Sequence, residues 1–215
     1  QIVYDEGVGY PILLGDVNKI KSMAEANSID LSDLPIFDPR SDEMEEKRNK
    51  YSEIFFAKRG RKGFNDYESK KVMKDRNYFG CMMVECGDAD AMISGLAKNY
   101  PDTIRPALQT IGTEEGVKKI AGMYLMLTKK GPLFLADTTV NFNPTAEELA
   151  EITLMVAREV KHFNITPRIA MLSYSNFGSS NSPEAKLVAH AREIVKQKMP
   201  SLIVDGEMQA SVAFS

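Results

Sequence analysis

Short apolar segments alternate with amphipathic helical segments along the whole chain, and this alternation constrains the fold more than any other feature. The apolar segments that we interpret as strands are residues 11–15, 34–37, 89–95, 117–127, 133–136, 169–172 and 202–205. Strands that alternate with helices form mostly parallel sheets with right-handed crossovers. The pattern changes at residues 112–116, which are polar and bounded by glycines, so we predict two α/β lobes, residues 1–115 and 116–215, with a cleft between them.

The most informative stretch for function is residues 168–186, RIAMLSYSNFGSSNSPEAK. A short buried strand is followed by a loop rich in serine, and a helix then starts with Ser182 as N-cap and Pro183 in the first helical position. Free backbone N–H groups and the positive end of the helix dipole would suit an anion at this place. The alternative is a surface connection that contains serine because serine turns easily.

Two other places carry cations suited to a phosphate group. Residues 58–63, KRGRKG, contain four cations and two glycines, and such a run is either a solvated surface or a loop that holds the phosphates of a ligand. Arg105 falls in the first turn of a predicted helix, near the end of the predicted strand 89–95. It either grips an anion or pairs with Asp102.

The composition and the missing motifs exclude several classes of function. A net charge of -3 over 215 residues gives no general attraction to nucleic acid or to an anionic membrane, and no apolar run approaches the length of a membrane span. Two cysteines, Cys81 and Cys86, make no disulfide framework, which fits the cytoplasm. The sequence has no dinucleotide fingerprint, Walker A loop or zinc-binding histidine motif, and we expect no metal site.

Several segments together resemble one family. They are NYFGCMMVECGDADAMISG, TIRPALQTIGTEEGVKKIAG, FLADTTVNFNPTAEELAEI, RIAMLSYSNFGSS and LIVDGEMQASVAF, which cover most of residues 11–214. As a set they are similar to the phosphotransacetylase (phosphate acetyltransferase) family. The resemblance implies two three-layer α/β/α lobes of the isocitrate and isopropylmalate dehydrogenase type, an acetyl-CoA cleft and a homodimer. It also implies that the first lobe is incomplete, without its first strand and its C-terminal return.

Details of the loop favour one branch of that family. Residues 176–180, Asn-Phe-Gly-Ser-Ser, are similar to the C-terminal domain of bacterial NADP-dependent malic enzymes, which convert malate to pyruvate. That resemblance implies an acetyl-CoA-sensing and oligomerisation domain, with upstream domains that hold NADP and a divalent metal. The alternative is a genuine phosphate acetyltransferase, represented by an incomplete chain, that makes acetyl phosphate and CoA from acetyl-CoA and phosphate. A scaffold that serves only oligomerisation is a third interpretation.

The resemblance also assigns ligand contacts one residue at a time. Arg105 matches a family arginine at the substrate site, and Arg61 matches a second one, with Arg59 as a competitor for that role. The loop that borders the ligand corresponds to Ser173, Ser175, Asn176, Gly178, Ser179 and Ser180. No catalytic residue is assigned, because the family's catalytic Ser–Arg pair and carboxylate lie in a later segment. We therefore expect acetyl-CoA as effector or substrate, no other cofactor on this chain, and no catalysis by it alone.

Overall fold

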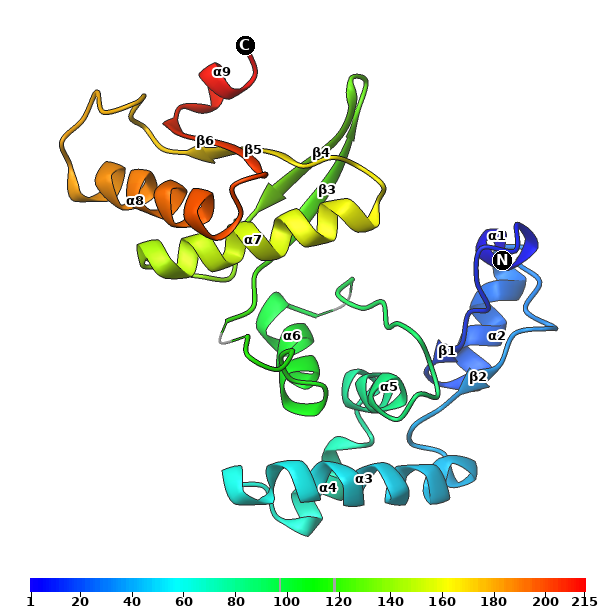
Figure 1. The fold of residues 1–215 in the computed structure, drawn as a ribbon. Helices are drawn as coiled ribbons and strands as arrows, with labels where there is room; N and C mark the ends of the chain where they lie inside the picture. Colours follow the sequence, from blue (N-terminus) through cyan, green and yellow to red (C-terminus); the bar gives the residue numbers. More distant parts are fainter. Residues whose placement is uncertain (97, 118) are drawn as a thin grey trace. The chain divides into compact units, whose positions relative to one another are not determined.

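The computed structural model describes residues 1–96, 98–117 and 119–215, which form two compact units, Gln1–Gly112 and Thr113–Ser215. Each unit combines helices with a pair of parallel strands (Figure 1). The prediction of an α/β protein with parallel strands is therefore confirmed. Each unit also has a hydrophobic cluster of its own.

The first unit is mostly helical. Its elements are α1 (Ile2–Asp5), β1 (Leu13–Leu14), α2 (Val17–Ala26), β2 (Ile36–Phe37), η1 (Asp42–Met44), α3 (Glu45–Arg59), η2 (Gly60–Lys62), α4 (Asp66–Val72), α5 (Arg76–Glu85) and α6 (Tyr100–Thr110). β1 pairs in parallel with β2, and α2 connects the two strands. α5 packs against α6, and α3 packs against α4 (Figure 1). The pair α5–α6 carries the candidate site.

Large side chains of α3 and α5 form the core of the first unit. Tyr51, Phe55, Phe79 and Met82 are completely buried. The rings of Tyr51 and Phe79 meet edge to face, with their centroids 5.2 Å apart. The Tyr51 hydroxyl donates a hydrogen bond to Asp88, which satisfies the one polar group of this aromatic pair.

The second unit is a hairpin followed by a β-α-β unit. Its elements are β3 (Met123–Thr128), β4 (Gly131–Ala136), α7 (Ala146–His162), β5 (Arg168–Leu172), α8 (Pro183–Lys198), β6 (Ile203–Met208) and α9 (Ala210–Ala213). β3 and β4 are antiparallel, whereas β5 and β6 are parallel and are connected through α8. α7 packs along α8, and α8 packs on β6 (Figure 1).

Small and branched residues let these helices approach the parallel strands closely. Ala150 and Ala157 of α7, together with Ala191 and Val195 of α8, are fully buried in one cluster with Met171 of β5. The core side of the β-α-β unit is therefore determined by the 3.6-residue spacing of apolar side chains on its two helices.

The helix starts follow the capping residues in the sequence. Asn65 and Thr145 each begin a helix with a reciprocal capping box that includes a glutamate three residues later. Ser182 accepts a hydrogen bond from the Ala185 amide ahead of Pro183, as predicted for the start of α8.

One predicted strand is wrong. Residues 89–95 are not a strand, and Ile93 is 99% exposed. A strand needs a neighbour for its backbone groups, and among the described residues this segment pairs with no other strand. The Ser94 hydroxyl instead donates to the Asn77 side chain, 2.8 Å away, so this segment is fixed to α5 through a side chain. Of the predicted strand 117–127, residue 118 lies outside the described residues, residues 117 and 119–122 are not a strand, and β3 begins at Met123.

None of the helices in the described part of the chain is long and apolar enough to cross a membrane.

The burial of Phe55 gives a test of the first unit's core. Phe55→Ala should lower the free energy of unfolding by about 3–5 kcal/mol, because the change removes a fully buried ring and leaves a cavity. Phe56 follows on the same helix and is 41% exposed, so Phe56→Ala should cost only about 1 kcal/mol. Urea unfolding followed by circular dichroism measures both, and equal costs would contradict this core.

Candidate functional site

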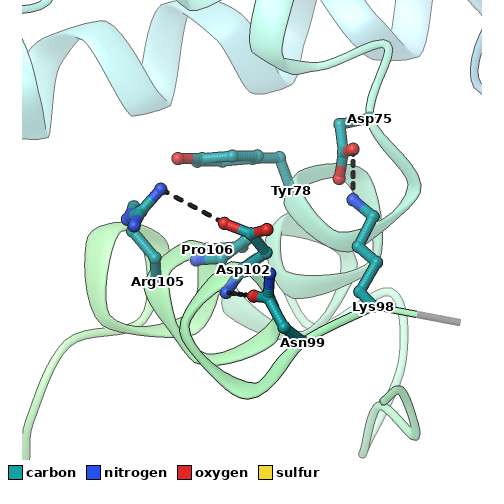
Figure 2. Close-up of a pocket in the computed structure, with 7 residues that line it drawn as sticks. All are labelled: Asp75, Tyr78, Lys98, Asn99, Asp102, Arg105 and Pro106. Atoms are coloured by element: carbon teal, nitrogen blue, oxygen red, sulfur yellow. Dashed lines mark hydrogen bonds and ion pairs between the residues drawn. The ribbon is translucent and has the colours of Figure 1, made fainter. Parts of the chain in front are cut away.

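The first unit has a pocket of about 410 Å³ between the beginnings of α5 and α6 (Figure 2). The residues that line it are Asp75, Tyr78, Lys98, Asn99, Asp102, Arg105 and Pro106. Arg105, which the sequence placed at a ligand site, is thus a pocket residue. Arg61 is not among these residues and lies exposed on η2.

The starts of α5 and α6 bring partial positive charge to this pocket. Asp75 caps α5 by accepting a hydrogen bond from the Asn77 amide at 2.8 Å, and Asn99 caps α6 by accepting one from the Asp102 amide at 3.0 Å. The backbone amides and the dipole of a helix start both favour an anion. These two amides are already bonded to the capping side chains, so the helix dipoles are what the backbone adds to the pocket.

Two cations in the pocket are paired with carboxylates. The Lys98 ammonium lies 2.6 Å from the Asp75 carboxylate, whereas the Arg105 guanidinium lies 3.5 Å from Asp102 (Figure 2). The Arg105 and Asp102 side chains are 58% and 50% exposed, and such solvated pairs contribute little to stability. A ligand can therefore bind Arg105 with little loss of free energy from the broken Arg105–Asp102 pair.

Tyr78 brings a phenol to the same pocket. Its hydroxyl donates a hydrogen bond to Gln109, and in Figure 2 this end of the ring extends to the same side of the pocket as Arg105. Burial raises the pKa of Tyr78, although the positive charges of Arg105 and Arg59 oppose that rise. The phenol is thus neutral at physiological pH.

Arg59 is the second arginine whose charge acts on Tyr78. Its Nε is buried and has no hydrogen-bond partner among the described residues, which is a costly state for a charged group. Neither Arg59 nor Arg61, the two arginines that the sequence left open, lines the pocket.

The second unit holds the other predicted site residues in one loop, residues 173–180, which we call the serine loop. It follows β5 and leads to α8. The structure places Ser173, Ser175, Asn176, Gly178, Ser179 and Ser180 in this loop. Ser175 is buried, and its hydroxyl is used inside the loop. The prediction of free backbone N–H groups is wrong for residues 175–180, since each of these amides already has an acceptor.

Glu207 of β6 is the residue that organises this loop, and the sequence analysis missed it. The side chain is 3% exposed, and its Oε1 accepts hydrogen bonds from the Gly178 amide at 2.6 Å and the Ser175 hydroxyl at 3.0 Å. The Gly178 hydrogen bond, supported by Ser175 and the charge of Arg192 and opposed by burial, holds the pKa of the Glu207 carboxyl below its usual value. Glu207 is thus a carboxylate at neutral pH.

Gly206 lets β6 lie close enough to β5 for the Glu207 side chain to reach the serine loop. It has a φ of +135°, and a Cβ at this position would lie 2.4 Å from the carbonyl oxygen of Met171. Any other residue would push β6 away from β5. In residues 205–207, DGE, the glycine thus allows the close backbone contact with β5, and the glutamate after it provides the carboxylate that bonds to the serine loop.

In the described residues no three His, Cys, Asp or Glu side chains converge as metal ligands would. Burial raises the pKa of the Cys81 and Cys86 thiols, which makes both poor nucleophiles.

The fold and the pocket define an α/β protein with a polar pocket at two helix starts, lined by two cations and two carboxylates. Comparisons identify its family. Residues 1–215 match the family described as phosphate acetyl/butaryl transferase. The phosphate acetyltransferase of Bacillus subtilis (strain 168) is 40% identical over 204 residues, which are 95% of this chain and 62% of that enzyme. A solved phosphotransacetylase from Streptococcus pyogenes is 32% identical, with a TM-score of 0.81 over 99% of this chain and 66% of that one. The chain belongs to the phosphate acetyl/butaryl transferase family and spans about two-thirds of these relatives.

The interpretation as a regulatory domain of a malic enzyme is wrong. An NADP-dependent malic enzyme of Escherichia coli (strain K12) is 35% identical over 208 residues, which are 97% of this chain and 27% of that enzyme. Phosphate acetyltransferases match this chain repeatedly, at 35–40% identity. The misleading motif, residues 176–180, lies on the serine loop, and a loop tolerates substitutions that a core does not. Residues 176–180 therefore do not show to which branch of the family this chain belongs.

The lowered pKa of Glu207 predicts a pH-dependent effect on stability. At pH 7, Glu207→Gln should lower the free energy of unfolding by about 1 kcal/mol, because a charge-assisted hydrogen bond becomes a neutral one. The folded-state pKa is below the unfolded value of about 4.3, so this contribution is present above pH 4.3 and is lost as the pH falls through the folded-state pKa. Urea unfolding of both proteins between pH 7 and pH 3 should show the difference shrinking in acid. A constant difference would contradict an ionised Glu207.

Proposed function

We propose that this chain is part of an enzyme that transfers an acetyl group between coenzyme A and inorganic phosphate. The observation that carries the proposal is the position of Arg105 in a pocket at the starts of α5 and α6. A phosphate group is matched there by a guanidinium fork and by the dipoles of two helix starts. Membership of the phosphate acetyl/butaryl transferase family supports the same class of reaction.

The reaction requires that phosphate be held and oriented and that a developing negative charge be stabilised, and this pocket has groups suited to both. A phosphate oxygen attacks the thioester carbonyl, the C–S bond breaks, and CoA leaves as a thiolate that takes up a proton. Arg105 would hold and orient the phosphate, and the helix starts would stabilise the negative charge that develops on the carbonyl oxygen. Asp75 and Asp102 both pair with cations, so neither is assigned as the base.

The other ligand contacts in this proposal come from a second arginine and from the serine loop. Arg59 is the better-supported second arginine, because it is close enough to influence Tyr78 while Arg61 is exposed. The serine loop residues, including Ser179 and Asn176, are proposed to contact the thioester ligand. A homodimeric assembly remains a prediction from the family resemblance.

Removal of the Arg105 side chain tests the proposal. Arg105→Ala should weaken the binding of inorganic phosphate about 10- to 100-fold, because a charge-assisted hydrogen bond contributes roughly 1.5–3 kcal/mol. Arg105→Lys should recover part of the loss, since lysine keeps the charge but not the fork. Calorimetric titration with phosphate and with acetyl-CoA measures both effects.

Arg40→Ala is the matched control, because it removes an exposed arginine of the same unit that lies outside the pocket. Its phosphate affinity should equal that of the unmodified chain. If Arg105→Ala also binds phosphate with unchanged affinity, the pocket is not the phosphate site and the proposal fails.

A further inference from the structure

Lys98 is the lysine that lines the Arg105 pocket in the described part of the chain, and the proposed reaction gives it no role. Its ammonium lies 2.6 Å from Asp75 Oδ2, and its side chain is 32% exposed. The other carboxylate oxygen of Asp75 accepts from the Asn77 amide, which holds the carboxylate at the start of α5. The Lys98 nitrogen is therefore held in one place, in a pocket of about 410 Å³ that a small molecule can enter.

Asp75 is a carboxylate at neutral pH. Burial opposes its ionisation, but the hydrogen bonds from Lys98 and from the Asn77 amide outweigh burial and lower the pKa of the Asp75 carboxyl. A carboxylate in contact with an amine can accept the proton that the nitrogen loses when it forms a bond to carbon. The pair thus combines a nucleophile with a proton acceptor.

The same pocket has a group that recognises phosphate. In Figure 2 the side chains of Lys98 and Arg105 reach the pocket from opposite sides, with Tyr78 between them. The Arg105 side chain is 58% exposed and only weakly held by Asp102, so its guanidinium can move with a bound phosphate. An acyl phosphate that Arg105 holds by its phosphate would bring its carbonyl carbon into the pocket with Lys98.

From these contacts we propose that Lys98 is acetylated by acetyl phosphate, the product of the proposed reaction, and that this modification limits further phosphate binding. The inference rests on the proposed function, which supplies the donor. The Lys98 nitrogen attacks the acetyl carbon, the bond from that carbon to the phosphate oxygen breaks, and inorganic phosphate leaves. The ammonium loses two protons as it becomes an amide: one is carried off by the phosphate, and the other passes through Asp75 to the solvent.

Acetylation changes the charge of the pocket. Its lining includes two cations, Lys98 and Arg105, and two carboxylates, Asp75 and Asp102. An acetylated Lys98 is neutral, so Asp75 loses its counter-ion and the balance of the pocket shifts by one negative charge. Phosphate is an anion and binds such a pocket more weakly. Accumulated acetyl phosphate thus lowers the phosphate affinity of the site that makes it.

The acetylation rates of two lysines in the same chain test the proposal. Lys70 is the internal control, because it pairs with Asp66 at 2.9 Å, is 54% exposed and lies outside the pocket. The chain is incubated with acetyl phosphate, and the acetylated peptides are quantified by mass spectrometry. Lys98 should react about tenfold faster than the more exposed Lys70, because its donor is held beside it.

Two further acetyl donors show whether phosphate directs the reaction. N-acetoxysuccinimide transfers an acetyl group but has no phosphate, so the preference for Lys98 should disappear. In Arg105→Ala the preference should disappear with acetyl phosphate as well. Equal rates at Lys98 and Lys70 with acetyl phosphate, or the same preference with both donors, would overturn the inference. So would a preference for Lys98 that acetyl-CoA produces and acetyl phosphate does not.

A neutral side chain at position 98 tests the effect on phosphate. Lys98→Gln imitates the acetylated lysine and should weaken phosphate binding roughly three- to fivefold in calorimetric titration, because a partly exposed charge has a modest effect on affinity. Lys98→Arg keeps the charge and should lose less. Lys70→Gln, the same change outside the pocket, should bind phosphate like the unmodified chain.

Unchanged phosphate affinity in Lys98→Gln would overturn the limiting effect of the modification. The proposed function is judged by a different measurement, the phosphate affinity of Arg105→Ala, so the two proposals can fail separately.

Discussion

Parallel pairing of β5 and β6 is the constraint on which the second unit depends. Because both strands run in the same direction, the residues that follow them meet at one edge, where the Ser173 amide donates to the carbonyl of Met208. This edge is where the serine loop begins and where Glu207 reaches it. The buried carboxylate is therefore a consequence of topology: an antiparallel pair would send the two ends to opposite edges.

The two units handle charge in opposite ways. In the first unit the cations face an open pocket, and the exposed pair of Arg105 and Asp102 can be exchanged for a ligand with little loss. In the second unit the charge of Glu207 is enclosed and already bonded, so it fixes a conformation. An enclosed charge with its partners in place costs much more to disturb than a solvated pair. One site is thus adapted to exchange ligands and the other to keep its shape.

The sequence predicted what is local and missed what is distant. Capping at Thr145 and Ser182 is decided by neighbours within four residues, and it was found. The predicted first-turn position of Arg105 is wrong, because α6 begins at Tyr100 and Arg105 therefore falls in its second turn. Residues 89–95 have a strand-like composition, but a strand also needs a partner that no local pattern reveals. Glu207 escaped for a related reason: the glycine before it resembles the end of a strand, and its contacts lie about 30 residues away.

Gly206 has a consequence for how such chains diverge. It touches no proposed ligand, yet any side chain there would collide with the backbone of β5 and separate Glu207 from the serine loop. A chain with this loop geometry therefore has no room for a side chain at this position. A related chain with a larger residue at the equivalent position would therefore be expected to hold its loop by other contacts.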